Sequence, residues 1–252
     1  MDAAEAFANS NLSLDEVSLA FLAGSLLNPL LKYLERRLSK FSNNDKVQSI
    51  LLSSWLLELK LSNMRLLGSV ANSDSLSDIL ELLKRLKDKL HHPTVYSILQ
   101  VHGCENFILE FAEIIHDWPQ VVRIHYNRRE YLKVLAYIER QSSFEMVYEY
   151  SPKLIGHVAN DLIALWMRCS ADLTFSSRLI IPSMLKYERM HAKGGMVTFK
   201  IIQGIIITFL VYIIQRGSTD SQMHNYLFFL YCKEKSISKI ESFLNSQVYR
   251  HV

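Results

Sequence analysis

Apolar residues recur at the 3.6-residue spacing of an α-helix along almost the whole chain. In one segment Leu31, Leu34 and Leu38 line one side of a predicted helix whose other side is charged. A second segment, residues 50–59, is apolar around most of the helix circumference, which is typical of a helix that packs between neighbours. Trp55 lies in this segment, so we expect its ring to belong to the core or to an interface.

No segment alternates between apolar and polar residues as a β-strand does, and only a few residues separate the predicted helices. Such short connections favour antiparallel neighbours. The sequence therefore predicts an all-α protein of about ten to thirteen helices, stacked as antiparallel pairs into a single α-solenoid segment over residues 1–252. Because the repeat period is not exact, a compact helical bundle is the alternative.

Residues 194–214 are atypical because they are more apolar than the rest of the chain. Their core is the run IIQGIIITFLVYII, residues 201–214. A helix that spans a bilayer needs about 20 apolar residues. We therefore interpret residues 201–214 as a buried helix, and a membrane-associated segment is the alternative.

The charge of the chain argues against a nucleic-acid partner. The net charge is only +3, whereas a nucleic-acid binder concentrates basic residues on one face. The basic cluster Arg123, Arg128, Arg129 and Lys133 adjoins Glu130 and is typical of a solvated helix face rather than a phosphate site. The three cysteines are far apart and lack C-x-x-C spacing, which indicates a reducing, cytosolic environment.

No residue pattern indicates catalysis, a cofactor or a metal. The phosphate-binding, dinucleotide-binding, serine-hydrolase and zinc-protease motifs are all missing from the sequence. Adjacent His91 and His92 point about 100° apart on a helix and are better explained as the C-terminus of a helix. Cys169 with His157 is a conceivable nucleophile and base, but no oxyanion-stabilising group accompanies them.

Four residues are candidates for a partner interface. Tyr148 and Tyr150 precede Ser151–Pro152 and are expected to be partly exposed near a helix boundary, and tyrosine is enriched at interfaces. Arg128 and Arg129 are the corresponding basic candidates. Packing between adjacent helix pairs is the alternative role for the two tyrosines.

Several tracts together resemble one known family, and they cover most of residues 30–245. They are SILLSSWLLELKL (49–61), ENFILEFAEIIHDWPQVVRIHYNRREYLKVLAYIE (105–139), VYEYSPKLIGHV (147–158), SRLIIPSMLKY (177–187) and HNYLFFLY (224–231). In their order and separation they resemble the clathrin-heavy-chain-repeat α-solenoid of the vacuolar protein sorting-associated protein 18 family, also called the deep orange family. None of these tracts is a catalytic signature.

This resemblance implies a scaffold subunit of the HOPS and CORVET class C tethering complexes. Such a subunit supports docking and fusion of vesicles with late endosomes, lysosomes or vacuoles. The implied partners are other class C subunits and, through them, Rab GTPases and SNAREs with their Sec1/Munc18-type chaperone. The implied location is peripheral, on the cytoplasmic face of these membranes or in the cytosol.

The chain also departs from the family pattern. Full members begin with a β-propeller and end with a zinc-binding RING, and the sequence shows neither, so zinc and ubiquitin-ligase activity are not carried over. Residues 194–214 are more apolar than the amphipathic helix that the family pattern places there. We therefore expect a fragment or short isoform that contains the solenoid region.

Overall fold

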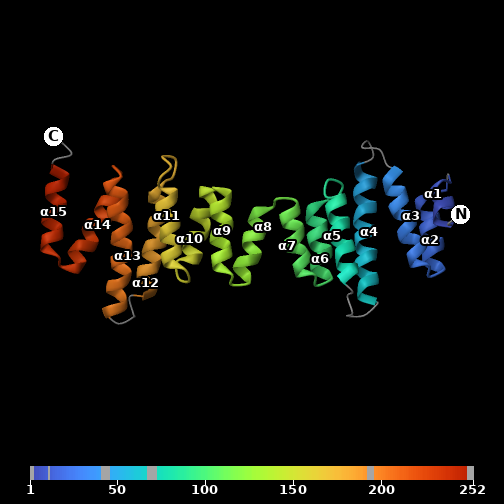
Figure 1. Cartoon of the computed structure of the whole chain (residues 1–252), viewed down its shortest axis with the longest axis horizontal. Coiled ribbons are helices and arrows are strands. Elements are labelled where there is room, and N and C mark those ends of the chain that lie inside the picture. Colours follow the sequence, from blue (N-terminus) through green and yellow to red (C-terminus); the bar gives the residue numbers. More distant parts are fainter. Residues whose placement is uncertain (1–2, 11, 41–45, 67–72, 192–195, 249–252) are drawn as a thin grey trace. The chain divides into compact units, whose positions relative to one another are not determined.

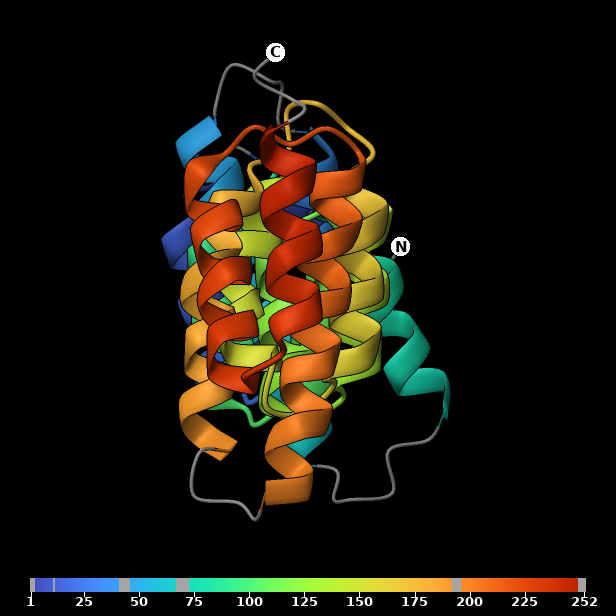
Figure 2. The same cartoon turned by 90° about the vertical axis from the view of Figure 1, so that its left-hand side faces the viewer.

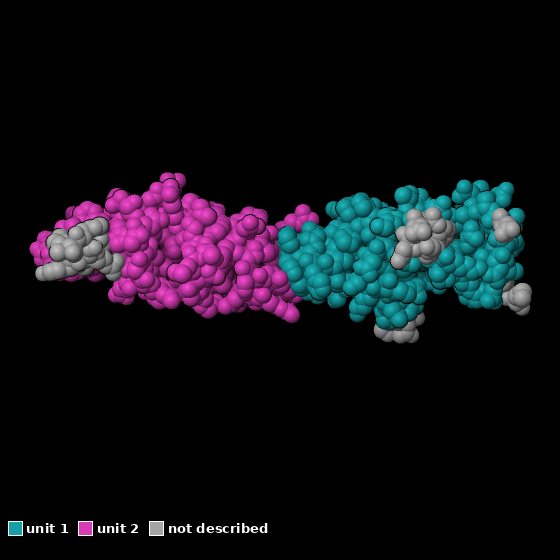
Figure 3. Space-filling view, turned by 90° about the horizontal axis from the view of Figure 1, so that it is seen from above, with its two compact units in different colours: residues 1–121 teal, residues 122–252 magenta. Residues whose placement is uncertain are grey.

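The computed structural model describes residues 3–10, 12–40, 46–66, 73–191 and 196–248. Within these ranges the chain forms fifteen α-helices and one short 3-10 helix, and contains no strand. The all-α prediction is thus confirmed, with more helices than expected. The chain divides into two compact units, residues 1–121 and 122–252, which Figure 3 shows in two colours. That residues 1–252 form one continuous solenoid segment stays a prediction.

The described residues of unit 1 form seven helices before α8, the helix in which the division falls. They are α1 (Ala3–Ala8), α2 (Leu14–Ala23), α3 (Leu27–Lys40), α4 (Lys46–Leu66), α5 (Ser73–Leu86), α6 (His92–Val101) and α7 (Glu105–Ile114), and α8 is Trp118–Asn127. Most of these helices contact the helices one or two places along the chain. This arrangement of successive neighbours is typical of a solenoid.

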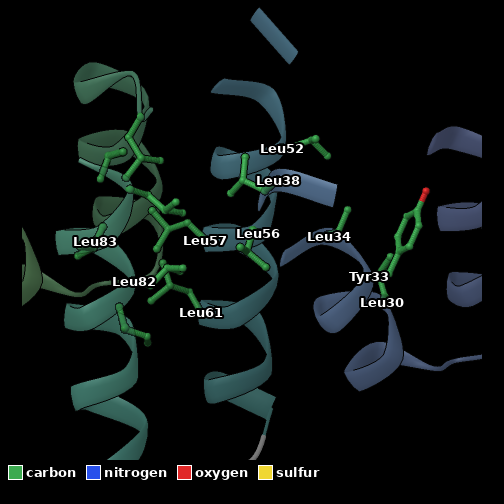
Figure 4. Packing of buried hydrophobic residues seen from close by; sticks show 14 of the residues in the cluster. Leu30, Tyr33, Leu34, Leu38, Leu52, Leu56, Leu57, Leu61, Leu82 and Leu83 are labelled. Atoms are coloured by element: carbon green, nitrogen blue, oxygen red, sulfur yellow. The ribbon is translucent and has the colours of Figure 1, made fainter. Parts of the chain in front are cut away.

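The core of unit 1 is built on α4, which lies between α3 and α5 (Figure 4). On one side of α4 Leu56 points toward α3, and on the other side Leu57 and Leu61 point toward α5. All three leucines are buried. A helix that is apolar on two sides can bury both of them only between two neighbours, so the prediction of a sandwiched helix is confirmed.

Unit 2 contains the helices from the end of α8 onward. They are α9 (Tyr131–Gln141), α10 (Phe144–Leu154), α11 (Ala159–Cys169), the 3-10 helix η1 (Ser177–Ile180), α12 (Ile181–His191), α13 (Met196–Gln215), α14 (Ser221–Glu234) and α15 (Ile237–Val248). Helices α9, α11 and α13 contact one another in sequence, and α10 contacts α12. Successive helices run in alternating directions (Figure 1), and α13, α14 and α15 lie side by side (Figure 2). Unit 2 is therefore a two-layered stack of antiparallel helices.

The atypical apolar segment forms most of α13. This helix packs on α11, α12 and α14, and its buried side chains are Gln203, Ile206, Ile207, Phe209, Leu210, Ile213 and Ile214. The interpretation of residues 201–214 as a buried helix is therefore confirmed for the side chains that the structure describes. Among the described residues, no helix combines the length and the apolarity that crossing a membrane requires.

Left-handed residues end the helices at a regular interval. Gly103, His116, Arg129 and Ser142 all have φ between 51° and 68°, and each follows its predecessor by thirteen residues. Each ends a helix of 10 or 11 residues, because a left-handed residue turns the chain away from the helix axis. Residues 91–154 therefore follow a thirteen-residue helix-and-turn period that the apolar pattern alone does not show.

The pair His91–His92 lies at the beginning of a helix. Helix α5 ends at Leu86, and α6 begins at His92 with Pro93 in its first turn. The prediction that these histidines form a helix C-terminus is therefore wrong. Proline fits the first turn of a helix, where its missing N–H is not needed, so Pro93 marks a helix start and not a stop. His91 Nδ1 lies 2.9 Å from the Thr94 hydroxyl oxygen at this N-terminus.

Candidate partner-binding surface

The two candidate arginines lie in the turn between α8 and α9. Arg129 has a left-handed backbone, with φ at 61°, and its N–H donates to the Tyr126 carbonyl at 3.0 Å. The next N–H, that of Glu130, donates to the His125 carbonyl at 3.0 Å and closes the helix end. The Arg129 side chain is exposed and that of Arg128 is half-buried. The predicted solvated position is thus confirmed for Arg129.

A buried histidine, His125, contacts both sides of this turn. His125 is 4% exposed, and its Nδ1 lies 2.5 Å from Glu130 Oε2. Lys133 Nζ donates to the other oxygen of the same carboxylate at 3.1 Å. Hydrogen bonds from His125 and then Lys133 lower the pKa of Glu130. The His125 ring also stacks on Tyr137 with centroids 5.2 Å apart, so the turn that displays Arg129 is anchored to both helices.

The two candidate tyrosines lie inside α10, because this helix continues through Pro152 to Leu154. Tyr150 is only 6% exposed, so the expectation of partial exposure near a helix boundary is wrong for it. Its ring packs edge-on against Tyr126, with centroids 6.1 Å apart, and the Lys153 ammonium lies 4.3 Å from its centre. Burial raises the pKa of Tyr150.

Tyr148 is half-buried and faces a different part of unit 2. Its hydroxyl accepts the Ser176 N–H at 2.7 Å, and its ring stacks on Phe175 at 5.5 Å. These two partners belong to the loop between α11 and η1. Tyr150 in contrast contacts Tyr126, one turn before Arg129. The structure therefore does not bring the four candidates together on one surface, and their role at an interface stays a prediction.

The conceivable pair of Cys169 and His157 is not brought together. His157 precedes α11 and Cys169 ends it, so the eleven residues of this helix separate them by about 15 Å. The His157 ring instead stacks on Tyr131 with centroids 4.2 Å apart. Burial raises the pKa of the Cys169 thiol, which favours the protonated, less nucleophilic form.

Each unit has a hollow that is lined by described residues. The first, of about 500 Å³, is lined by residues that include Met64, Leu80, Cys104 and Glu110. The second, of about 260 Å³, is lined by Phe144, Leu165 and Cys169, and the Arg168–Glu139 ion pair stands beside it. Among the described residues, no group of three or more histidine, cysteine or carboxylate side chains is placed to hold a metal ion.

Two family models together match nearly the entire chain. Residues 2–117 match the first half of the VPS18 alpha-solenoid domain, and residues 118–251 match its second half. The chain belongs to the VPS18 family. The predicted fold class, an α-solenoid of antiparallel helix pairs, is thereby confirmed.

Curated relatives agree with the VPS18 assignment. The vacuolar membrane protein pep3 of Schizosaccharomyces pombe is 26% identical over 98% of this chain. The vacuolar sorting protein 18 of Arabidopsis thaliana is 28% identical over 94% of it, and the vacuolar protein sorting-associated protein 18 homolog of Danio rerio is 24% identical over 93%. The chain spans 28%, 24% and 24% of the length of these three relatives.

The VPS18 solenoid also contains a buried charged cluster that the sequence pattern does not predict. Glu188 of α12 is 7% exposed and forms an ion pair with Lys233 of α14, and the Tyr226 hydroxyl donates to its other oxygen at 3.4 Å. Burial raises the pKa of Tyr226 well above its ordinary value, and the nearby negative charge of Glu188 raises it further. These residues are 38 to 45 positions apart, so no local sequence pattern connects them.

Proposed function

We propose that this chain is a scaffold subunit, or the solenoid part of one, in a HOPS/CORVET-type class C tethering complex. It acts by protein–protein contact, supporting the docking and fusion of vesicles with late endosomes, lysosomes or vacuoles. Its partners are other class C subunits and, through them, Rab GTPases and SNAREs with their Sec1/Munc18-type chaperone. It works at the cytoplasmic face of these membranes as a peripheral protein and has no catalytic step of its own.

The observation that carries this proposal is the pair of family matches that covers both halves of the chain. The architecture supports it, because stacked helix pairs present long surfaces built from many helices, as repeat proteins do when they bind partners. The described titratable groups support a structural role. Glu130 and Glu188, for example, have their carboxylate oxygens engaged by side chains of the same unit.

Affinity capture with named partners tests the proposal. Tagged wild-type chain, incubated with a cell lysate, should recover the other class C subunits, as detected by antibodies against each of them. The variant Leu83→Asp places a carboxylate at a fully buried position of unit 1 and should lose this recovery together with its helical fold. The matched control Lys84→Asp introduces the same residue at the adjacent exposed position and should keep both.

The proposal is wrong if the folded wild-type chain recovers none of the class C subunits from a lysate in which a full-length relative does. It is also wrong if Leu83→Asp unfolds unit 1, recovery of class C subunits through unit 2 persists unchanged, and unrelated helical proteins recover the same subunits equally well. Circular dichroism of each variant separates loss of binding from loss of structure.

A further inference from the structure

Two turns of unit 2 share a residue pattern in the same structural register. Arg129 and Lys235 each have a left-handed backbone two residues before the next helix begins, with φ at 61° and 54°, and both side chains are exposed. A lysine then occupies the third position of each following helix, Lys133 in α9 and Lys239 in α15. The two turns therefore present basic residues in the same way although about a hundred residues separate them.

Each turn also displays a large apolar side chain to solvent. Leu132, the second residue of α9, is 62% exposed, and Ile237, the first residue of α15, is 71% exposed. At the end of α12, between these turns along the chain, Met190 is 53% exposed. Exposed apolar side chains are thus interspersed with basic ones.

A series of contacts places these helix ends along one edge of unit 2. Tyr131 at the start of α9 stacks on His157, in the turn between α10 and α11. Met190 of α12 covers Gly156 in that same turn. In Figure 1 the turns α8–α9, α10–α11 and α14–α15 all lie on the lower side of unit 2. We call this side the basic edge, and its members are Arg128, Arg129, Leu132, Lys133, Lys153, His157, Lys186, Arg189, Met190, Lys233, Lys235, Ile237 and Lys239.

The acidic residues near the basic edge are largely engaged in ion pairs. Glu130 pairs with His125 and Lys133, Glu188 with Lys233, Glu234 with Lys239 and Glu149 with Lys153, and Asp161 and Glu241 add two exposed carboxylates. The nine lysines and arginines of the basic edge thus outnumber these six carboxylates, although four of the lysines are themselves ion-paired. The opposite ends of the same helices are balanced in charge. Their charged residues are Glu139, Arg140, Glu145, Arg168, Asp172, Arg178, Arg216 and Asp220.

Helix capping alone does not explain the basic edge. The negative C-terminal end of a helix dipole favours cations, which accounts for a basic residue after α8 and after α14. The N-terminal end disfavours cations, so the dipole does not account for Lys133 and Lys239 in the first turns of α9 and α15, where each lysine instead pairs with a glutamate of the preceding turn. Capping also gives no reason for Leu132 and Ile237 to face solvent.

We infer that the basic edge of unit 2 binds the surface of a membrane that contains anionic phospholipids. Basic residues near such a surface are attracted to its negative potential, and neighbouring apolar side chains insert at the boundary between headgroups and acyl chains. The inference goes beyond the scaffold role and does not depend on it, because it concerns the chain without partners.

Vesicle binding by the purified full chain tests the inference. The chain should float with phosphatidylcholine vesicles that contain phosphatidylserine and should not float with phosphatidylcholine alone. Binding should weaken as salt is added, because salt screens exposed charges. The paired variant Arg129→Gly with Lys235→Gly should weaken binding about 25-fold, at about fivefold for each positive charge removed.

Glycine suits this test because it adopts the left-handed conformation of both positions without strain. The paired variant should therefore keep or raise its melting temperature while it loses vesicle binding. A charge-matched control, Arg140→Ala with Arg216→Ala, removes two cations from the opposite edge and should bind as wild type does. A second test pair, Leu132→Ser with Ile237→Ser, should weaken binding several-fold and leave its salt dependence unchanged.

The inference is overturned if the wild-type chain does not bind vesicles with phosphatidylserine. Equal weakening by the control pair, or none by the glycine pair, overturns it as well. The capture experiment distinguishes it from the scaffold role, since the glycine pair should still recover class C subunits. If the glycine pair loses a class C subunit and no form of the chain binds vesicles, the basic edge binds an acidic protein surface and the membrane assignment is wrong.

Discussion

The indole N–H of Trp166 in α11 donates a hydrogen bond to the Ser151 hydroxyl oxygen of α10 at 2.9 Å, and both residues are completely buried. The same hydroxyl donates to the Val147 carbonyl within its own helix. One serine therefore connects the two layers of unit 2 at a fully buried point. A buried indole N–H that loses its acceptor keeps the full desolvation penalty.

The first prediction follows from this contact. Ser151→Ala removes the acceptor of the Trp166 N–H and should lower the free energy of unfolding by about 1–3 kcal/mol. Urea denaturation followed by tryptophan fluorescence measures the change. Ser170→Ala is a suitable control, because its half-buried hydroxyl bonds to the Met167 carbonyl one turn away. Equal stability of the two variants would show that the buried hydrogen bond is unimportant.

A second prediction concerns Trp55 on α4. Its ring is half-buried and packs against the core of unit 1, so Trp55→Ala should lower the free energy of unfolding by about 2 kcal/mol, less than for a fully buried tryptophan. The adjacent Leu56 has no exposed surface, and Leu56→Ala should cost about 2–5 kcal/mol. Thermal denaturation and partner capture are measured together. If Trp55→Ala weakened capture at an unchanged melting temperature, the exposed part of the ring would belong to an interface.

The thirteen-residue period shows how far the sequence predicts this fold. In that register residues 99, 112, 125, 138 and 151 occupy equivalent, buried positions. Leu99, Ala112 and Ile138 follow the apolar pattern, so their helices could be predicted from spacing. His125 and Ser151 break it. His125 Nδ1 is paired with Glu130 and the Ser151 hydroxyl with Trp166, and those partnerships depend on how the helices pack.

The candidate interface was harder to predict for a related reason. A tyrosine on a helix suits a core and an interface equally well, and only tertiary packing shows that Tyr150 lies against Tyr126 while Tyr148 reaches Ser176. The Ser151–Pro152 pair suggested a helix boundary, since proline disfavours helix interiors. Helix α10 nevertheless continues past Pro152 to Leu154, so both tyrosines lie in its interior and not at a helix boundary.

A third prediction uses the ion pair between α12 and α14. Lys233→Ala leaves the buried Glu188 carboxylate with the long hydrogen bond from the Tyr226 hydroxyl. It should lower the free energy of unfolding by about 1–3 kcal/mol, less than for a fully buried pair because Lys233 is partly exposed. Lys153→Ala, which removes an exposed pair with Glu149, should cost about 0.5 kcal/mol. Urea denaturation compares the two variants. If Lys233→Ala lowered the free energy of unfolding by less than Lys153→Ala does, the structural role of Glu188 would be contradicted.

A fourth prediction concerns pH and the turn between α8 and α9. The pKa of Glu130 is lowered in the folded chain by hydrogen bonds from His125 and Lys133. A carboxyl group whose pKa is lower in the folded chain stabilises the fold at pH values above its pKa in the unfolded chain. This stabilisation is lost as the pH falls through the pKa that the group has in the folded chain. Glu130→Gln should therefore melt below wild type at neutral pH, and the two melting curves should converge under acidic conditions. A difference that grew as pH fell would contradict this sign.

The last prediction tests the regular turns. Ser142 ends α9 in a left-handed conformation, with φ at 51° and ψ at 29°, and its N–H donates to the Glu139 carbonyl. A residue with a Cβ atom pays about 1–2 kcal/mol to adopt this conformation, whereas glycine does not. Glycine also loses more backbone entropy on folding, which offsets part of that gain. Ser142→Gly should therefore raise the free energy of unfolding by about 0.5–1 kcal/mol.

At Gly103, which occupies the same register with φ at 68°, the reverse change Gly103→Ala should destabilise by a similar amount even though the site has open space for a methyl group. Thermal denaturation of both variants checks the pair, and a stabilised Gly103→Ala would show that left-handed strain does not govern these helix ends.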